Sequence, residues 1–233
     1  MVRFTDRERL RVVTLDRPDR RNALRPADLD ALEAAVTGAA AADVPVVYLH
    51  GAGPAFCAGA DLDVVASLAE PEAFARHGQR VADTIETADP VVVAGVDGAA
   101  RGGGVELALA CDLRIATPEA TFAEPGVRFG LFGAWGGTVR LPRVMREGDA
   151  LDFALSGRAI DAEEALRTGL VSRIEEDPMA VAERLAANEP DALEVVKARM
   201  RDQRKKEEQE TAEADAFGEL VRAHAVDIAV DRG

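Results

Sequence analysis

Several residue types are scarce in this chain of 233 residues, and each scarcity excludes a class of protein. Its two cysteines, Cys57 and Cys111, lie in apolar surroundings and cannot form a zinc site or a C-x-x-C redox pair. We therefore expect two reduced, buried thiols. The three histidines, His50, His77 and His224, stand far apart without the spacing of metal ligands, so we expect no metal site.

Long apolar runs are also missing. The longest, such as Val91–Val96, are far too short to cross a bilayer, and residues 1–10 contain no apolar signal core. The net charge of −14 disfavours nucleic acid or an anionic membrane as a partner. Lysine is rare beside arginine, which either a salt-rich source or GC-rich codon usage would produce. We expect a cytoplasmic protein that binds neither nucleic acid nor membrane.

Strand-like and helical segments alternate along the chain. Apolar runs predict strands at 10–15, 44–49, 90–96, 113–116 and 170–174. Helical spacing and turn residues predict helices over 26–39, 71–88, 104–110, 138–144 and 161–168. This order predicts an α/β fold with mostly parallel strands. We expect a main domain over 1–174 and a helical C-terminal region over 175–233 that covers the site, mediates oligomerisation, or both.

Two glycine-containing turns each follow a strand-like run and precede a segment that can begin a helix. They are Gly51–Leu62, G-A-G-P-A-F-C-A-G-A-D-L, and Arg101–Asp112, R-G-G-G-V-E-L-A-L-A-C-D. Backbone N–H groups at such positions can stabilise negative charge that develops on a carbonyl oxygen. We identify the N–H groups of Ala58 and Gly103 as candidate donors to one oxygen. For either turn alone, tight strand–helix packing is the alternative interpretation.

Glu106 lies in the first turn of the helix that follows the second glycine turn. Its carboxylate would lie near the same oxygen-binding pocket, where it could hold a water or move a proton at the carbon beside a carbonyl. An acid that only stabilises the helix N-terminus is the alternative. The apolar residues L-A-L-A that follow favour the functional interpretation. No G-x-G-x-x-G after a strand supports a dinucleotide site, and no G-x-S-x-G supports a serine hydrolase.

These motifs resemble the enoyl-CoA hydratase/isomerase (crotonase) family over most of the chain. The segments that carry the resemblance are 13–24 (V-T-L-D-R-P-D-R-R-N-A-L), 55–62 (A-F-C-A-G-A-D-L), 98–112, 129–142 and 156–171. The resemblance implies a crotonase-like spiral of ββα turns, assembled as a homotrimer or homohexamer. It also implies an acyl-CoA thioester as substrate and no separate cofactor, because coenzyme A is part of that substrate.

The resemblance also implies roles for individual residues. The backbone N–H groups of Ala58 and Gly103 would form the oxyanion hole, and Glu106 would be the first of the two catalytic glutamates of the hydratases. The residues that it places on the coenzyme A or acyl group are Ala58, Gly59, Ala60, Asp61, and Arg20 or Arg21.

The sequence departs from the family at the second catalytic glutamate. The hydratases have F-x-x-P-E, whereas Phe122–Gly126 reads F-A-E-P-G, so Gly126 stands at the glutamate position. Glu124 lies two residues away, but Pro125 stiffens the path between them. We expect a surface position for Glu124, with a catalytic role as the alternative. Arg101, where the family usually has an uncharged residue, is a second departure.

The predicted function is that of an acyl-CoA enzyme that works through a thioester enolate. Enoyl-CoA hydratase, a lyase that adds water reversibly to a 2-enoyl-CoA, is the first hypothesis. Enoyl-CoA isomerase and acyl-CoA decarboxylase are alternatives, because both need the enolate pocket but not two glutamates. A non-catalytic acyl-CoA-binding member of the family is a further alternative.

Overall fold

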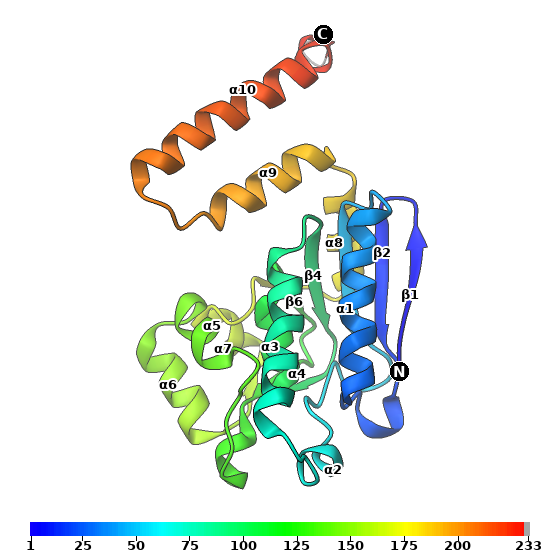
Figure 1. Cartoon of the computed structure of the whole chain (residues 1–233), viewed down its shortest axis with the longest axis vertical. Helices are drawn as coiled ribbons and strands as arrows, with labels where there is room; N and C mark the ends of the chain where they lie inside the picture. Colours follow the sequence, from blue (N-terminus) through cyan, green and yellow to red (C-terminus); the bar gives the residue numbers. More distant parts are fainter. Residues whose placement is uncertain (231–233) are drawn as a thin grey trace.

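The computed structural model describes residues 1–230, in which two β-sheets organise the chain (Figure 1). The larger sheet has the strand order β1–β2–β3–β4–β6–β9, and the smaller has the order β5–β7–β8. The strands of the larger sheet are β1 (Val2–Arg7), β2 (Leu10–Leu15), β3 (Val46–Gly51), β4 (Val91–Val96), β6 (Leu113–Ala116) and β9 (Arg173–Ile174). The smaller sheet contains β5 (Ala99–Arg101), β7 (Thr121–Ala123) and β8 (Ile160–Asp161).

Helices return the chain between the strands. They are α1 (Pro26–Ala41), α2 (Leu62–Val65), α3 (Pro71–Thr87), α4 (Gly103–Ala110), α5 (Gly137–Val144), α6 (Glu147–Ser156), α7 (Ala162–Thr168), α8 (Pro178–Ala186), α9 (Pro190–Met200) and α10 (Lys206–Val230). Two 3₁₀ helices, η1 (Pro18–Arg20) and η2 (Pro125–Phe129), complete the set. From β2 to β9 the larger sheet is parallel, as the strand–helix order predicts.

The parallel sheet is covered on both faces, which is why its strands are nearly continuous apolar runs. On one face α1, α3 and α4 contribute to the main hydrophobic core, which includes Leu32, Val81 and Leu107. On the other face, residues of α8 such as Val181 and Ala182 complete a second apolar cluster. None of the helices in residues 1–230 combines the length and apolar character needed to cross a bilayer.

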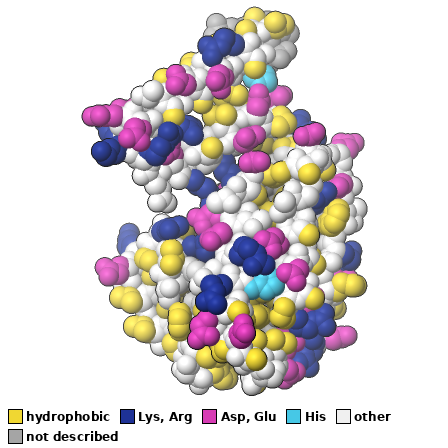
Figure 2. All heavy atoms as spheres, viewed as in Figure 1, with side chains coloured by type: hydrophobic (Ala, Val, Ile, Leu, Met, Phe, Trp, Pro, Cys, Tyr) yellow, Lys and Arg dark blue, Asp and Glu magenta, His cyan; other side chains and the backbone are white. Residues whose placement is uncertain are grey.

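The C-terminal region divides at a different point from the predicted boundary at residue 175. Helix α8 belongs to the core, because its apolar side chains pack on the sheet. Helices α9 and α10 instead form a hairpin that projects from the body (Figure 1). Figure 2 shows a recess between this hairpin and the body. Lys197 of α9 and Arg201, which caps its C-terminus, attach the hairpin to Asp112 at 2.9 Å and 2.7 Å.

The sequence did not predict several short elements. Strand β1 lies at a sheet edge and is mostly exposed, and only two of its residues, Val2 and Phe4, are apolar, so it lacks an apolar run. Strands β5, β7 and β8 have only two or three residues, which is too short for a periodic pattern. These strands nevertheless position the site, because β5 leads directly into the second glycine turn.

Candidate active site

The two glycine turns lie in contact. Cys57 forms a parallel bridge with Ala100, and the Arg101 N–H donates to the Cys57 carbonyl oxygen at 2.9 Å. Gly59 has φ +83°, and a Cβ at this position would lie 2.8 Å from the Gly103 nitrogen. Glycine is therefore required at residue 59, for its left-handed backbone and for the close approach of the second turn. The predicted convergence of the two turns is present.

The structure changes which N–H of the first turn is available. The Ala58 N–H donates to the Arg21 carbonyl oxygen at 2.9 Å, so the predicted donor is already occupied. Leu24 forms a parallel bridge with Ala60: the Leu24 N–H donates to the Gly59 carbonyl oxygen, and the Asp61 N–H donates to the Leu24 carbonyl oxygen. In this pairing the N–H of Ala60 points away from Leu24. The sequence could not show this difference, because it depends on a pairing with a distant segment.

Gly103 begins α4, where an N–H has no partner within the helix. Within residues 1–230, no backbone carbonyl accepts from the N–H of Ala60 or of Gly103. Both residues line the same cavity. Trp135 packs over Gly103, since a Cβ there would lie 2.3 Å from its ring. Ala60 therefore replaces Ala58 as the partner of Gly103 in the candidate oxyanion hole.

This cavity has a volume of about 410 Å³ and a mostly apolar wall. The apolar side chains that line it are Leu62, Val65, Leu68, Phe74, Phe129, Leu131, Phe132 and Trp135. Three acidic residues line it: Glu72 is exposed, whereas Glu106 and Glu124 are buried and reach the cavity from different elements. An apolar cavity with a few fixed polar groups is the usual form of a small-molecule site.

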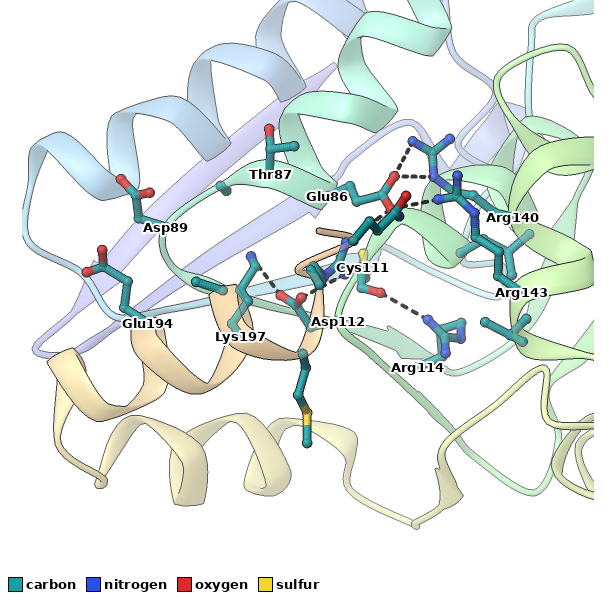
Figure 3. A pocket seen from close by; sticks show the side chains of 17 residues that line it. Glu86, Thr87, Asp89, Cys111, Asp112, Arg114, Arg140, Arg143, Glu194 and Lys197 are labelled. Atoms are coloured by element: carbon teal, nitrogen blue, oxygen red, sulfur yellow. Dashed lines mark hydrogen bonds and ion pairs between the residues drawn. The ribbon is translucent and has the colours of Figure 1, made fainter. Parts of the chain in front are cut away.

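A second cavity, of about 630 Å³, lies between α9 and the body (Figure 3). It is larger, but the two acidic groups at its centre are paired: Glu86 contacts Arg140 and Arg143, and Asp112 contacts Lys197. These pairs attach elements to one another. The smaller cavity contains the two converging turns and is the better candidate site.

Glu106 is buried, with only 2% of its surface exposed. Its Oε1 accepts hydrogen bonds from the backbone N–H groups of Trp135 and Gly137, each at 2.7 Å. Burial raises the pKa of Glu106 to about 7, although these two donors and the charge of Arg140 oppose the shift. The carboxyl therefore faces the cavity rather than solvent, which removes the helix-cap alternative.

Glu124 is also buried, with 5% of its surface exposed, so the expected surface position is wrong. It follows β7, and its side chain enters the cavity beside Glu106. A Cβ on Gly133 would lie 3.0 Å from Glu106 Oε1 and 3.1 Å from Glu124 Oε2, so both carboxyl groups approach the same point. Burial and the charge of Glu106 raise the pKa of Glu124 to about 8. Its Oε1 has no hydrogen-bond partner within the described chain.

Of the residues predicted to contact the substrate, some line the cavity and others do not. Ala58 and Ala60 line the cavity, whereas Gly59 and Asp61 are absent from its wall. Asp61 caps α2 and lies 2.8 Å from Arg17 and 3.7 Å from Arg20, so its charge is used within the fold. Arg20 also contacts Asp63.

Arg21 and Arg101 lie on either side of the first turn. Arg21 is exposed and accepts the Ala58 N–H through its carbonyl oxygen. The Arg101 guanidinium donates to the carbonyl oxygens of Ala100 (2.9 Å) and Thr121 (2.7 Å). Arg101, the second departure from the family, thus ties β5 to β7.

Asn22 is a functional support that the sequence did not reveal. Only 1% of its surface is exposed, and its Nδ2 donates to the carbonyl oxygens of Ala55 (2.7 Å), Ala52 (3.0 Å) and Phe56 (3.2 Å). It therefore holds the segment that leads into the first glycine turn. Asn22 has φ +58°, a conformation that asparagine tolerates better than most residues.

Replacing Asn22 by alanine is expected to lower the free energy of unfolding by about 3 kcal/mol, because buried carbonyl oxygens lose their donor. Urea unfolding measures the change. Asn22→Asp keeps the acceptor for the Arg17 N–H but turns an ionised oxygen toward the same carbonyl oxygens, so its loss of stability should be at least as large. A loss below about 1 kcal/mol for alanine would contradict the assigned role.

Comparisons with known proteins agree with this geometry. The family model described as enoyl-CoA hydratase/isomerase matches residues 5–228. The chain belongs to the enoyl-CoA hydratase/isomerase family. Crotonyl-CoA hydratase of Syntrophomonas wolfei is 41% identical over 173 residues, which cover 72% of this chain and 66% of that protein. (E)-benzylidenesuccinyl-CoA hydratase of Thauera aromatica is 40% identical over 177 residues, covering 73% and 68%. The chain thus spans about two thirds of the length of these curated relatives.

Solved structures of this family confirm the predicted crotonase-like fold. The enoyl-CoA hydratase of Thermoplasma volcanium superposes with a TM-score of 0.91 at 28% identity, covering 99% of this chain and 96% of that one. The enoyl-CoA hydratase of Bacillus anthracis gives 0.91 at 29% identity, again covering 99% and 96%.

The family's second glutamate position is tightly packed here. Gly126 lies in η2, and a Cβ on it would lie 3.1 Å from the Leu131 carbonyl and from the Phe132 Cα. A side chain at this position would need the neighbouring backbone to move by a few tenths of an ångström. The carboxyl that faces Glu106 comes instead from Glu124, on the other side of Pro125.

The burial of Glu124 gives stability a specific dependence on pH. In the unfolded chain this carboxyl ionises near its ordinary pKa of 4.5, whereas in the folded protein its pKa is about 8. Between these pH values only the unfolded chain releases the proton freely, so folding becomes less favourable as pH rises.

Glu124→Gln is therefore expected to stabilise the protein relative to the unchanged chain at pH 9 by about 3 kcal/mol, with little difference at pH 4. Urea unfolding of both proteins at the two pH values measures this. An equal difference at pH 4 and pH 9 would show that the carboxyl titrates normally in the folded state.

Proposed function

We propose that this protein is an enoyl-CoA hydratase, which adds water reversibly to the double bond of a 2-enoyl-CoA. The observation that carries the proposal is the Glu106 carboxyl, buried in an apolar cavity and fixed by two N–H donors beside the turns of Ala60 and Gly103. Relatives named crotonyl-CoA hydratase and short-chain-enoyl-CoA hydratase, at 41% and 36% identity, support it.

In this proposal the thioester carbonyl oxygen binds to the N–H groups of Ala60 and Gly103. These donors stabilise the enolate that forms when water attacks the β-carbon, and such donors are typically worth about 3 kcal/mol each. Glu106 accepts a proton from the attacking water. The charge is handled by amides and carboxyl groups, so we propose no metal and no cofactor besides the coenzyme A of the substrate.

The remaining features of the proposal concern the substrate and the assembly. We assign the apolar wall to the acyl group and Arg21 to the coenzyme A phosphates, because Arg20 is already paired with Asp61 and Asp63. We retain a homotrimer or homohexamer in the cytoplasm as the proposed state. The two free, buried cysteines are consistent with a reducing compartment.

Incubation of the pure protein with crotonyl-CoA tests the function. We expect loss of the absorbance of the conjugated thioester, and formation of 3-hydroxybutyryl-CoA. Absence of hydration across enoyl-CoA substrates of several chain lengths would overturn the assignment. The missing carboxyl at Gly126 favours the isomerase and decarboxylase alternatives, whereas the buried carboxyl of Glu124 supports the hydratase.

A further inference from the structure

The two buried carboxyl groups of the cavity have unequal surroundings. Glu106 Oε1 accepts two backbone N–H groups, whereas Glu124 Oε1 has no partner within the described residues. Both groups approach the point that a Gly133 Cβ would occupy. Two ionised carboxylates so close in an apolar cavity would repel each other, so the pair retains one proton at neutral pH. That proton resides on Glu124, because the N–H donors stabilise the charge of Glu106.

Within residues 1–230, the charge that shifts the pKa of Glu124 is that of Glu106. A small cavity of about 30 Å³ beside it is lined by residues of η2, α5, α6 and the intervening loop: Val127, Phe132, Gly133, Gly137, Thr138, Leu141 and Ala154. None of these side chains is ionisable. Arg140, the cation of α5 that acts on Glu106, directs its guanidinium to Asp83 and Glu86. Glu106 is therefore the charged group that faces Glu124 within residues 1–230.

The smaller sheet explains why a residue at 124 reaches the site. Strands β5 and β7 are parallel, with Arg101 opposite Ala123, and the Gly102 N–H donates to the Ala123 carbonyl oxygen at 3.0 Å. The residue after Ala123 therefore lies beside the turn that begins α4. Glu124 and Gly103 border the same cavity for this reason.

We propose that Glu124 is the catalytic acid that delivers a proton to the α-carbon of the substrate, in place of the carboxyl absent at Gly126. This inference rests on the proposed hydratase function and adds a residue to it. Glu106 and Glu124 would then act on the same face of the double bond, as base and acid.

The step balances as follows for hydration. The water oxygen bonds to the β-carbon while Glu106 takes one of its protons, and the π electrons of the double bond move into the enolate. The α-carbon of the enolate then takes the proton of Glu124, which restores the thioester carbonyl. The product has gained one water, Glu106 holds a proton and Glu124 is ionised. Transfer of that proton between the two carboxyl groups restores the starting state.

Two reactions separate the roles of the carboxyl groups. Hydration of crotonyl-CoA needs both, whereas exchange of the α-protons of butyryl-CoA with D₂O needs only a group that acts at the α-carbon. We expect Glu124→Gln to lower hydration by about 10²-fold and to abolish exchange, with coenzyme A binding unchanged. Glu106→Gln should abolish hydration and retain exchange.

The pH profile gives an independent measure. In the unchanged protein, kcat should fall at high pH as Glu124 loses its proton, and this fall should be absent from the residual activity of Glu124→Gln. If the glutamine variant does not fold, Glu124→Asp keeps the acid but withdraws it by one methylene, and both reactions should be slower.

The outcomes distinguish this proposal from the proposed function. Hydration and exchange at unchanged rates in Glu124→Gln, or in Glu124→Asp if that is the variant that folds, would overturn the role of Glu124 and leave the hydratase function standing. Exchange that is lost in Glu106→Gln but kept in Glu124→Gln would show that the roles are reversed. An unchanged protein that hydrates no enoyl-CoA would overturn both.

Discussion

Replacing Glu106 by glutamine is expected to lower kcat for enoyl-CoA hydration by about 10⁴-fold, with little change in KM. The glutamine oxygen can still accept the N–H groups of Trp135 and Gly137, so the local structure should persist. What is lost is the ability to take a proton from water. Stopped-flow or steady-state absorbance with crotonyl-CoA measures the effect.

The matched control for this substitution is Glu119→Gln. Glu119 is exposed and lies outside the cavity wall, so the same chemical change there should leave kcat unaltered. If Glu106→Gln kept even a tenth of the activity, Glu106 could not be the base. Such a result would revive the non-catalytic interpretation.

Gly59→Ala is expected to lower kcat by about 10³-fold, because it displaces the two turns that hold the thioester oxygen. Its methyl group would lie 2.7 Å from the Arg101 carbonyl oxygen and 2.8 Å from the Gly103 nitrogen. The φ of +83° adds backbone strain for alanine, and together we expect a loss of about 2 kcal/mol in unfolding free energy. Turnover and urea unfolding are measured on the same preparation.

Gly169→Ala separates the loss of stability from the loss of catalysis. Gly169 has φ +86°, and a methyl there would lie 2.5 Å from the Val144 carbonyl oxygen, a strain similar to that at Gly59. It follows α7 and lies outside the cavity wall. We expect a similar loss of stability with kcat unchanged. Equal kcat values for the two alanine variants would refute the oxyanion-hole geometry.

The sequence predicted the elements whose pattern is local. Helix α3 and strand β6 were expected almost at their observed limits, because each has enough residues for a helical or apolar pattern to be recognised. The glycine motifs located the two turns, and the family resemblance added the spiral arrangement. The parallel order of β2, β3, β4 and β6 follows from the returning helices.

The errors concern contacts between distant segments. Whether Ala58 or Ala60 presents a free N–H depends on Arg21 and Leu24, which lie more than thirty residues earlier. Glu124 is buried because the segment around Gly133 covers it, and nothing adjacent to Glu124 in the sequence indicates this cover. Motif spacing alone therefore located the site but could not assign its donors.

Every residue that lines the catalytic cavity lies between Ala58 and Trp135, whereas the projecting hairpin begins only at Pro190. The residues of the cavity and those of the hairpin thus come from separate stretches of the chain. Substitutions on α9 and α10 can therefore change the outer surface of the molecule without replacing any residue that lines this cavity.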